Sequence, residues 1–356
     1  MRGFNVSCLT EMRKLVAETL IKKWPGRAMI SRHTVFLHLC SMKLIPEPMG
    51  RTVRVKAPAT VSNLNCGFDV LGFAVNEPYD IVEVELTATS SIEIAAIRGC
   101  DTLSTDPDKN VVGAVLRAMI EATGREAGFR VIIEKGIKPG SGIGSSAASS
   151  AAAALAGNLL LDSVFTVSEL VRFAMEGERL ASGAPHADNV APALYGGITL
   201  VRSYEPLDIV QLNVPGELFC VIIHPEMEIK TSVSRGLLDT HLPLGTAVRQ
   251  WGNVGGLVAG LYREDYELIS RSLVDFVAEP KRAGLIPGFD ELKKSALRSG
   301  ALGAGISGSG PSVFALCRGE EVAGSVLKSM QGVMVSAGID FKAYLSPVGL
   351  RGAEIC

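Results

Sequence analysis

The sequence has no hydrophobic run of the length that a membrane-spanning helix needs. Its seven cysteines are scattered and odd in number, and none of them forms a CxxC pair, so neither a zinc site nor a disulfide framework is indicated. The formal net charge of −2 argues against a dedicated binder of nucleic acid or of anionic membranes, because such proteins carry a basic excess. We therefore expect a cytoplasmic protein with free thiols, no nucleic-acid partner and no membrane association.

What the sequence does contain is typical of a globular protein. Its 356 residues are enough for two domains with their own cores, and 47% of them are apolar and 20% charged. Glycine is abundant, with 38 residues, which predicts many tight turns or close backbone approaches.

The first fifty residues differ from the rest. They contain several Lys and Arg and lack the long apolar core of a secretory signal. A transit peptide is conceivable, but Glu11 and Glu18 weaken that interpretation. Met42 and Met49 both precede the first regular strand. We expect residues 1–50 to be a dispensable extension, either disordered or absent from the native protein because translation starts later.

From residue 52 the hydrophobic pattern becomes regular, with a strand, then a loop at residues 57–60. The helix expected over 167–181 has Ser168 as its N-cap. Strands and helices alternate, but the early strands are hairpin-like, which favours an α+β protein in two layers. We place the domain boundary so that the domains are 51–205 and 206–356. The expected strands are 52–56, 80–86, 92–97, 128–134, 196–201, 218–224, 301–306, 312–317 and 341–345, and the expected helices 110–122, 146–161, 167–181, 248–261, 266–276, 289–297 and 320–336.

The most informative segment is the glycine- and serine-rich loop Pro139–Ser149, which follows a strand and opens a helix. Its glycines let backbone N–H groups converge on one anion, and the helix N-terminus adds partial positive charge. The loop lacks the Lys-Ser/Thr ending of a Walker A loop, its glycine spacing does not fit the dinucleotide fingerprint, and it contains no GxSxG. Alone, such a loop is about as consistent with a flexible connector as with a phosphate site.

A second loop of small residues, 303–312, lies between two late strands. On its own it would indicate a β-turn. Two such loops in one chain predict a shared pocket.

Acidic and polar residues follow the phosphate-loop candidate. Mg²⁺ prefers one or two carboxylates together with phosphate oxygens and water, so Glu178 and the Ser146 hydroxyl are candidate ligands. Asp188, in the cluster His-Ala-Asp-Asn, is a candidate to accept a proton from a substrate hydroxyl. A solvated helix face and an Asp-Asn turn remain the alternatives.

In the polar segment 58–69, Asn63 and Asp69 are candidates to bind an amine, although a plain loop has the same composition.

With these four segments the chain resembles the GHMP family of small-molecule kinases, and within it the homoserine kinases. The loop Pro139–Ser149 is similar to the family's phosphate loop, and 303–312 to its third motif. Residues 56–72 and 186–192 resemble segments of the homoserine kinases, although Asn65-Cys66 stands where these more often have Gly and a small residue. The implied fold has two domains, an N-terminal ATP-binding domain like ribosomal S5 domain 2 and a ferredoxin-like C-terminal domain.

The resemblance also implies a role for each matching residue. Asp188 and Thr231 are expected to be catalytic, and Ser146 and Glu178 to bind Mg²⁺. The expected substrate-binding residues are Asn63, Asp69, His186, Asn189, Arg235 and Arg282, and the expected ATP-binding residues are Pro139, Gly140, Ser141, Gly142, Ile143, Gly144, Ser145, Ser146 and Ala147. Asp69 suits an ammonium group, and two arginines suit a carboxylate because guanidinium groups form forked hydrogen bonds.

The resemblance therefore predicts transfer of the γ-phosphate of ATP to L-homoserine, giving O-phospho-L-homoserine in threonine biosynthesis, with Mg²⁺ as cofactor and a homodimer as the assembly. Two alternatives stay open. In the first, the chain is another GHMP kinase whose acceptor is mevalonate or a sugar. In the second, it is a catalytically silent binding protein of the same fold.

Overall fold

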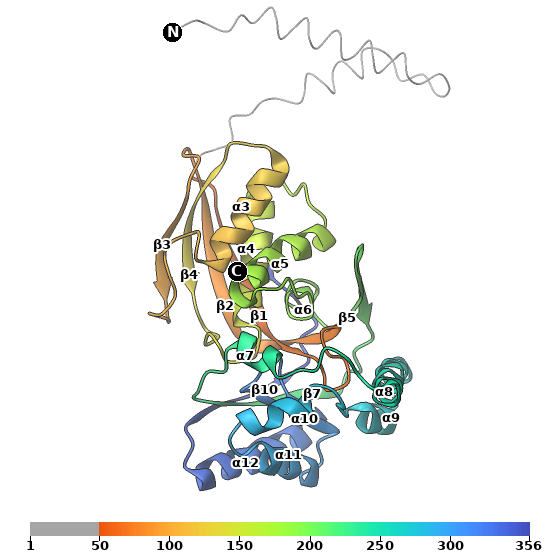
Figure 1. Ribbon diagram of the computed structural model, residues 1–356. Helices are drawn as coiled ribbons and strands as arrows, with labels where there is room; N and C mark the ends of the chain where they lie inside the picture. Colours follow the sequence, from red (N-terminus) through yellow and green to blue (C-terminus); the bar gives the residue numbers. More distant parts are fainter. Residues whose placement is uncertain (1–49) are drawn as a thin grey trace, which may run out of the picture. The chain divides into compact units, whose positions relative to one another are not determined.

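The computed structural model of the protein describes residues 50–356, and the strands of this part form two sheets (Figure 1). The first sheet is seven-stranded, with the order β11-β1-β2-β4-β3, and β5 pairs with both β2 and β6. Only the β3–β4 pair is parallel. The strands are β1 (Thr52–Ser62), β2 (Leu71–Thr87), β3 (Ile92–Arg98), β4 (Gly128–Glu134), β5 (Ile198–Tyr204), β6 (Leu207–Leu212) and β11 (Glu354–Ile355).

The second sheet is four-stranded and antiparallel, with the order β10-β7-β9-β8. Helices connect β7 to β8 and β9 to β10, which is the split βαβ arrangement of ferredoxin-like folds. The strands are β7 (Leu218–Pro225), β8 (Gly303–Ile306), β9 (Val313–Arg318) and β10 (Phe341–Pro347).

Four helices accompany the first sheet, and α4 packs directly on β1 and β2 with α3 and α5 beside it. The sequence of α4 explains this central place, because a helix built almost entirely of Ala, Ser and Gly can be buried on nearly all sides. The helices are α3 (Val111–Thr123), α4 (Ser145–Leu160), α5 (Val167–Ser182) and α6 (Val190–Tyr195).

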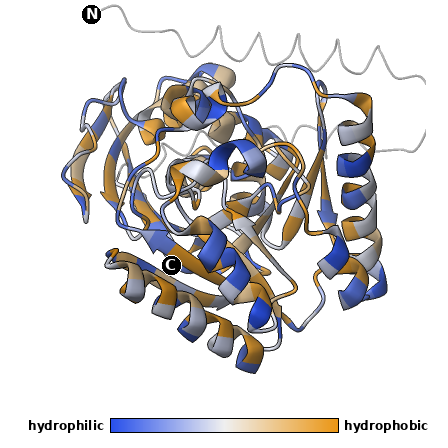
Figure 2. Ribbon diagram, turned by 60° about the horizontal axis from the view of Figure 1, so that its bottom comes forward, coloured by the Kyte–Doolittle hydropathy of each residue, from blue (hydrophilic) through white to orange (hydrophobic). Residues whose placement is uncertain are grey.

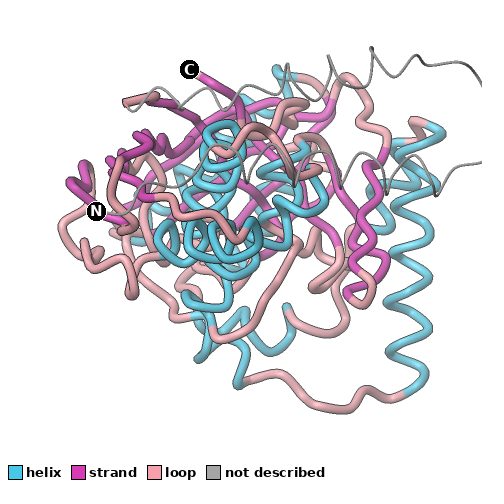
Figure 3. Tube along the Cα trace, turned by 90° about the horizontal axis from the view of Figure 1, so that it is seen from above, coloured by secondary structure: helices cyan, strands magenta, loops and turns pink. Residues whose placement is uncertain are grey.

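The remaining helices follow β7 in the chain. In Figure 3, a view from above, α8 is the long helix at the edge of the fold. No helix within residues 50–356 is both long and apolar enough to cross a membrane. The helices are α7 (Thr231–Gly236), α8 (Leu244–Arg263), α9 (Tyr266–Ser272), α10 (Glu279–Arg282), the 3-10 helix Ala283–Leu285, α11 (Phe289–Arg298) and α12 (Glu320–Ala337).

The strand β7 lies between two hydrophobic cores. Cys220 and Ile222 face the larger core, which also contains α4, whereas Val221 and Ile223 face the core under α11 and α12. Since alternate side chains of a strand point to opposite faces, a strand buried on both faces reads as one continuous apolar run. The second sheet is therefore anchored to the first by packing and by one isolated antiparallel β-bridge, between Val75 of β2 and Val348 after β10.

Two local expectations were wrong. Residues 57–60 are strand and not loop, because β1 continues to Ser62 and pairs with β2 on both sides of a register shift between Pro58 and Thr60. The N-cap of α5 is Thr166 rather than Ser168. The Thr166 side chain accepts the N–H of Glu169, and the Glu169 carboxylate accepts the N–H of Thr166, so the two residues form a capping box.

Other boundaries also moved. The helix expected over 266–276 ends at Ser272, and the Asp275 carboxylate instead accepts N–H groups at the start of α10. The strand β6 was not expected, and its hairpin with β5 places the turn at the predicted domain boundary between residues 205 and 206. The division into domains 51–205 and 206–356 remains a prediction. The predicted extension, residues 1–50, lies outside the described residues apart from Gly50.

Asn65 ties the turn after β1 to the second half of the chain, which yields a stability prediction. Its buried Nδ2 donates to Leu273 O at 2.7 Å and to Ala304 O at 3.1 Å. In Asn65→Ala the free energy of unfolding in urea should fall by about 1–3 kcal/mol, because two buried carbonyl groups lose their partner.

The matched control is Asn253→Ala, which removes one similar bond, from Nδ2 to Val274 O at 3.0 Å, at an exposed position. This variant should lose less than about 1 kcal/mol. Equal losses in the two variants would contradict the structural role given to Asn65.

Candidate active site

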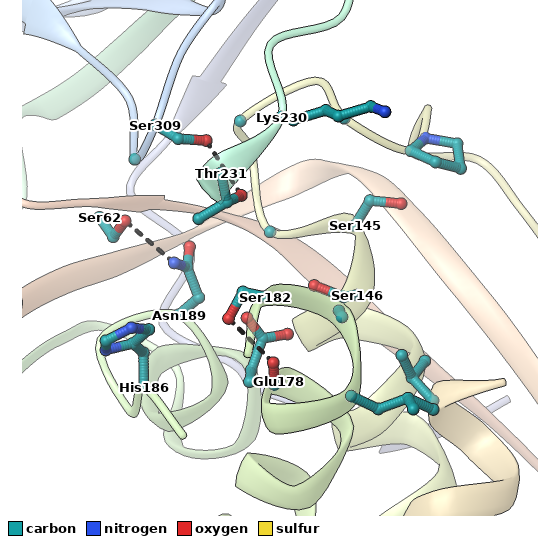
Figure 4. Close-up of a pocket in the computed structure, with 18 of the residues that line it drawn as sticks. Ser62, Ser145, Ser146, Glu178, Ser182, His186, Asn189, Lys230, Thr231 and Ser309 are labelled. Atoms are coloured by element: carbon teal, nitrogen blue, oxygen red, sulfur yellow. Dashed lines mark hydrogen bonds between the residues drawn. The ribbon is translucent and has the colours of Figure 1, made fainter. Parts of the chain in front are cut away.

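A cavity of about 570 Å³ lies between the two small-residue loops, α5 and α7 (Figure 4). The structure brings most of the predicted site residues to its wall. Ser141, Ile143 and Ala147 are the exceptions, because these three are buried behind the wall. The predicted residues that line the cavity are Asn63, Asp69, Pro139, Gly140, Gly142, Gly144, Ser145, Ser146, Glu178, His186, Asp188, Asn189, Thr231, Arg235 and Arg282.

The phosphate-loop candidate has the backbone that the sequence predicts. Gly140, Gly142 and Gly144 all have positive φ, so left-handed residues alternate along the loop and turn successive N–H groups to one side. Glycine is also needed for space. A Cβ on Gly142 would come within 2.5 Å of Gly310 O, and one on Gly144 within 2.0 Å of Thr60 Oγ1.

Helix α4 starts directly after this loop, and no described side chain caps it. The Ser145 hydroxyl donates to Ile137 O at 2.9 Å. The first-turn N–H groups of a helix have no partner within the helix and favour an anion. The start of α4 at the cavity wall therefore suits a phosphate group.

The second loop is hydrogen-bonded to the first. The Ser307 hydroxyl donates to Gly142 O at 2.8 Å, and the Ser312 hydroxyl donates to Ser141 O at 2.6 Å. The backbone N–H of Ser312 also donates to Ser141 O. The prediction that the two loops share one pocket is thus supported by direct contacts between them, in the turn that joins β8 and β9.

His224 on β7 supports this junction from behind. Its Nδ1 lies 3.3 Å from Ser312 Oγ, whose single proton goes to Ser141 O. His224 Nδ1 is therefore the donor in this contact, and its buried Nε2 has no hydrogen-bond partner among the described residues. Burial also lowers the pKa of His224 to about 4, in keeping with a neutral ring.

A buried ion pair of Lys135 and Asp80 lies under the start of α4, and sequence reasoning missed it. Lys135 Nζ contacts Asp80 and also donates to Ser145 O at 2.9 Å and to Ser149 Oγ at 3.0 Å. Both charged side chains are at most 2% exposed. The pair fixes the first turn of α4, but in the sequence Lys135 and Asp80 look like ordinary residues at the ends of amphipathic strands.

Glu178 and Ser146 lie together on one wall, and Figure 4 shows Glu178 between Ser146 and Ser182. Burial raises the pKa of Glu178 to about 7, although the Ser146 hydroxyl and Lys135 oppose the rise. Its buried Oε1 has no hydrogen-bond partner among the described residues. A buried carboxylate oxygen without a partner next to a hydroxyl is a donor set that fits Mg²⁺, which takes few protein ligands beside phosphate oxygens and water.

Asp188 is buried in the turn between α5 and α6. Burial and the neighbouring Asp69 charge raise the pKa of Asp188 to about 7, and a hydrogen bond from Ser62 opposes this. A carboxyl group with that pKa can accept a proton near neutral pH. The arrangement therefore agrees with the predicted role of Asp188 as a base.

A charged cluster occupies the other end of the cavity. Arg235 on α7 binds Asp69 through two hydrogen bonds of 3.0 and 2.9 Å, and these raise the pKa of Arg235 although burial alone would lower it. Arg282 on α10 donates to Gly308 O, and burial together with the Arg235 charge lowers its pKa. His186 Nδ1 lies 4.0 Å from Asp69, and burial lowers the pKa of His186.

The cluster rests on a strained turn between β1 and β2. Asn63 and Asp69 have positive φ values of 73° and 59°, and the Asn63 side chain accepts the N–H of Asp69 and donates to Gly308 O. The Tyr204 hydroxyl donates to Asp69 O at 2.8 Å. Such strain is held by surrounding contacts and is common at binding sites.

At the cavity wall, the side chains of two predicted site residues are hydrogen-bonded to other residues of the protein. Asn189 accepts from Thr60 Oγ1 at 2.8 Å and donates to Ser62 Oγ at 3.0 Å, so its amide fastens α6 to β1. Thr231, at the start of α7, lies 3.4 Å from Ser309 in the second loop.

Sequence reasoning also missed Phe68, whose ring packs against the guanidinium groups of both site arginines.

Comparison with known proteins agrees with this geometry. The sequence models of the GHMP kinases N-terminal domain and C-terminal domain match residues 110–197 and 257–335. The homoserine kinase of Chlorobaculum tepidum is 46% identical over 318 residues, which cover 86% of this chain and 98% of that protein. The chain belongs to the GHMP kinases.

Solved GHMP kinase structures carry the same fold. A homoserine kinase from Cytophaga hutchinsonii is 48% identical, with a TM-score of 0.84 over 88% of this chain and all of that one. The L. major mevalonate kinase, at 16% identity and a TM-score of 0.65, shares the fold alone. The predicted α+β, two-domain GHMP kinase fold is confirmed.

The buried carboxyl of Glu178 gives a pH-dependent stability prediction. Because its folded-state pKa is raised above the ordinary value of 4.5, its contribution to stability is fully present below pH 4.5 and is lost as pH rises through about 7. Without nucleotide or divalent cations, Glu178→Gln should match the parent chain near pH 5. Near pH 8 it should be more stable, by at most on the order of 3 kcal/mol in urea unfolding.

The control is Glu121→Gln, an exposed position on α3. Its stability curve should run parallel to that of the parent chain across the same pH range. A parallel curve for Glu178→Gln would show that the Glu178 carboxyl is not held in the buried state described above.

Proposed function

We propose that this GHMP kinase transfers the γ-phosphate of ATP to the hydroxyl group of L-homoserine, giving O-phospho-L-homoserine for threonine biosynthesis. The observation that carries the proposal is the charge arrangement at one end of the cavity, where Asp69 faces Arg235 and Arg282. A ligand that suits it has one cationic and one anionic group next to a hydroxyl. The names of its homoserine kinase relatives in Chlorobaculum tepidum and Cytophaga hutchinsonii support the same acceptor.

The phosphate end of the cavity suits the ATP chain. The alternating glycines and the start of α4 offer N–H groups to the β- and γ-phosphates. Phosphoryl transfer depends mostly on positioning and on charge neutralisation rather than on covalent chemistry by the protein. The Lys135–Asp80 pair contributes by holding Ser145 and Ser149, so that the first turn of α4 stays in place.

The acceptor end is selective because Asp69 and Arg235 already pair with each other. An amino acid can separate them at little cost, since its ammonium group replaces Arg235 beside Asp69 and its carboxylate replaces Asp69 beside the arginines. Mevalonate has a carboxylate but no ammonium group. It would leave the Asp69 charge without a partner, and removing one partner of a partly buried ion pair is costly.

The proton of the acceptor hydroxyl is assigned to Asp188. This carboxyl is buried beside Asp69, Ser62 and Arg235, and its raised pKa suits a group that takes up a proton near neutral pH. Thr231 on α7 is assigned to the same reaction centre, opposite Ser309. Asn63 and His186 are assigned to the substrate through their contacts with Asp69.

Glu178 and Ser146 are the residues that would hold Mg²⁺, as the unpartnered Glu178 Oε1 supports. When bound there, the cation neutralises negative charge on the phosphate oxygens. Cytoplasmic location and a homodimer are part of the proposal. The buried thiols of Cys66, Cys220 and Cys317, whose pKa values burial raises, suit a reducing compartment.

An ADP-release assay with Mg·ATP and a panel of acceptors tests the proposal. L-Homoserine should give turnover, and mevalonate and galactose should give rates close to the acceptor-free background. Turnover with mevalonate or galactose alone would reassign the acceptor within the family. No turnover with any of the three would favour a silent binding protein.

Asp69→Asn tests the assignment of the ammonium site. Loss of the charged partner should raise the KM for L-homoserine by about 30- to 100-fold, whereas the KM for ATP should change by less than about threefold. Steady-state kinetics with each substrate varied in turn measure both values.

The control is Asp208→Asn on β6. It removes the carboxylate from the exposed ion pair between Asp208 and Arg202 and should leave both KM values unchanged. A rise of equal size in both KM values for Asp69→Asn would count against the ammonium site.

A further inference from the structure

The phosphate loop, Pro139–Ser149, carries no cation of its own. A Walker A loop ends in Lys-Ser/Thr, and its lysine reaches the β- and γ-phosphates of the nucleotide. The loop of this chain contains neither Lys nor Arg. ATP is a polyanion, and phosphoryl transfer requires that its negative charge be neutralised. A cation from another segment of the chain is therefore expected at this end of the cavity.

Three lysines line the cavity, and two of them already have carboxylate partners. Lys135 is buried in its ion pair with Asp80, and Lys109 pairs with Asp106 at 3.2 Å. The side chain of Lys230 has no hydrogen bond or ion pair within residues 50–356. The arginines of the cavity belong to the charged cluster at its other end. Of the described residues, Lys230 is thus the cation left to meet a phosphate group.

The chain on both sides of Lys230 is fastened to the second small-residue loop. Ile229 is buried, and its Cδ1 would lie 3.5 Å from a Cβ on Gly310. On the other side, the Thr231 hydroxyl lies 3.4 Å from the Ser309 hydroxyl. The backbone of Lys230 therefore has a fixed place directly before α7, whereas its side chain is exposed and can move.

The same segment also lies against the phosphate loop. A Cβ on Gly140 would come within 2.4 Å of Glu228 Cγ, so residue 228 packs directly on that glycine. In Figure 4 the Lys230 side chain extends toward the side of the pocket on which Ser145 lies, and away from His186. Since a lysine amine sits on a flexible four-carbon stem, Lys230 can follow a phosphate bound on the loop.

Nearby carboxyl groups make a cation at this end more necessary. Glu178 and Glu228 both line the cavity. A polyphosphate on the loop would meet like charges there, and such contacts weaken binding. A divalent cation held by Glu178 and Ser146 would offset one of the two carboxyl groups, but Glu228 lies outside that donor set.

An exposed lysine alone indicates nothing about function. Hydrophilic residues recur along the outer helices, as Figure 2 shows for α8 at the right of the view. Lys230 differs from these residues because it lines the cavity and lies in a segment that contacts both loops.

We propose that the Lys230 ammonium group contacts the β- and γ-phosphates of ATP and supplies the positive charge that the phosphate loop lacks. The inference rests on the proposed function in placing ATP on that loop. As the bond between the γ-phosphorus and the bridging oxygen breaks, its electron pair goes to the β-phosphate of ADP. The acceptor oxygen bonds to the phosphorus and loses its proton to Asp188. Lys230 stays protonated, forms no covalent bond, and offsets the charge that grows on the β-phosphate.

Lys230→Met tests the contact, because methionine keeps an unbranched side chain and removes the charge. Calorimetric titration of the full-length chain with ATP, ADP or AMP, with Mg²⁺ and without acceptor, separates a phosphate contact from a structural role. The Kd values of ATP and ADP should rise about 10- to 100-fold, since a charged hydrogen bond is lost. The Kd of AMP, which has no β- or γ-phosphate, should change by less than about threefold.

Steady-state kinetics give a second readout. In Lys230→Met the kcat with L-homoserine should fall about 10- to 100-fold, because charge on the leaving ADP is no longer offset. The KM for L-homoserine should change by less than about threefold. Lys230→Arg keeps the charge and should recover most of the lost ATP affinity.

The matched control is Lys138→Met. Lys138 directly precedes the phosphate loop, pairs with Glu226 and does not line the cavity, so it carries the same charge in the same region without facing the nucleotide. This variant should keep all three Kd values within about threefold of the parent values. Circular dichroism should show the same helix content in the parent chain and in each variant.

Equal Kd values for ATP in the parent chain and in Lys230→Met would overturn the inference and leave the proposed function standing. A loss of AMP binding as large as the loss of ATP binding would overturn it as well. A loss of ATP binding in Lys109→Met but not in Lys230→Met would assign the contact to Lys109 instead. A parent chain that binds none of the three nucleotides would overturn the proposed function and this inference with it.

Discussion

The hydrogen bonds between the two small-residue loops are the contacts on which the rest of the site depends. Ser307 and Ser312 donate to the carbonyl groups of Gly142 and Ser141, and these bonds join the two loops at the cavity. Residues from the first sheet's helices and from α7 and α10 line the same cavity as the two loops. His224 strengthens the junction by donating to Ser312 from β7.

Burial gives the two ends of the cavity different chemistry. At the phosphate end, Glu178 is a buried carboxyl with an unpartnered oxygen, and the start of α4 has no side-chain cap. At the other end, opposite charges are already paired, as in the bond between Asp69 and Arg235. The phosphate end therefore has polar groups without partners, which a cation and phosphate groups would supply. At the other end, a ligand with one positive and one negative group can replace the existing partners of Asp69 and Arg235.

The sequence predicted what depends on local pattern. The alternating glycines of the phosphate loop, the alanine-rich α4 and the regular strands were recognisable because spacing and composition determine them. The continuation of β1 through Pro58 was missed because a register shift accommodates the proline. The Lys135–Asp80 pair and the stacking of Phe68 were missed because they join residues far apart in the chain. The hydrogen bonds of Asn189 with Thr60 and Ser62 were missed for the same reason.

The most direct measurement is ³¹P NMR of the full-length chain with Mg·ATP and L-homoserine. The account predicts a new phosphomonoester resonance that grows as the γ-phosphate signal of ATP disappears. That resonance should be split into a triplet by the two methylene protons next to the ester oxygen. A γ-phosphate signal that converts only to inorganic phosphate, with no ester resonance, would contradict the account.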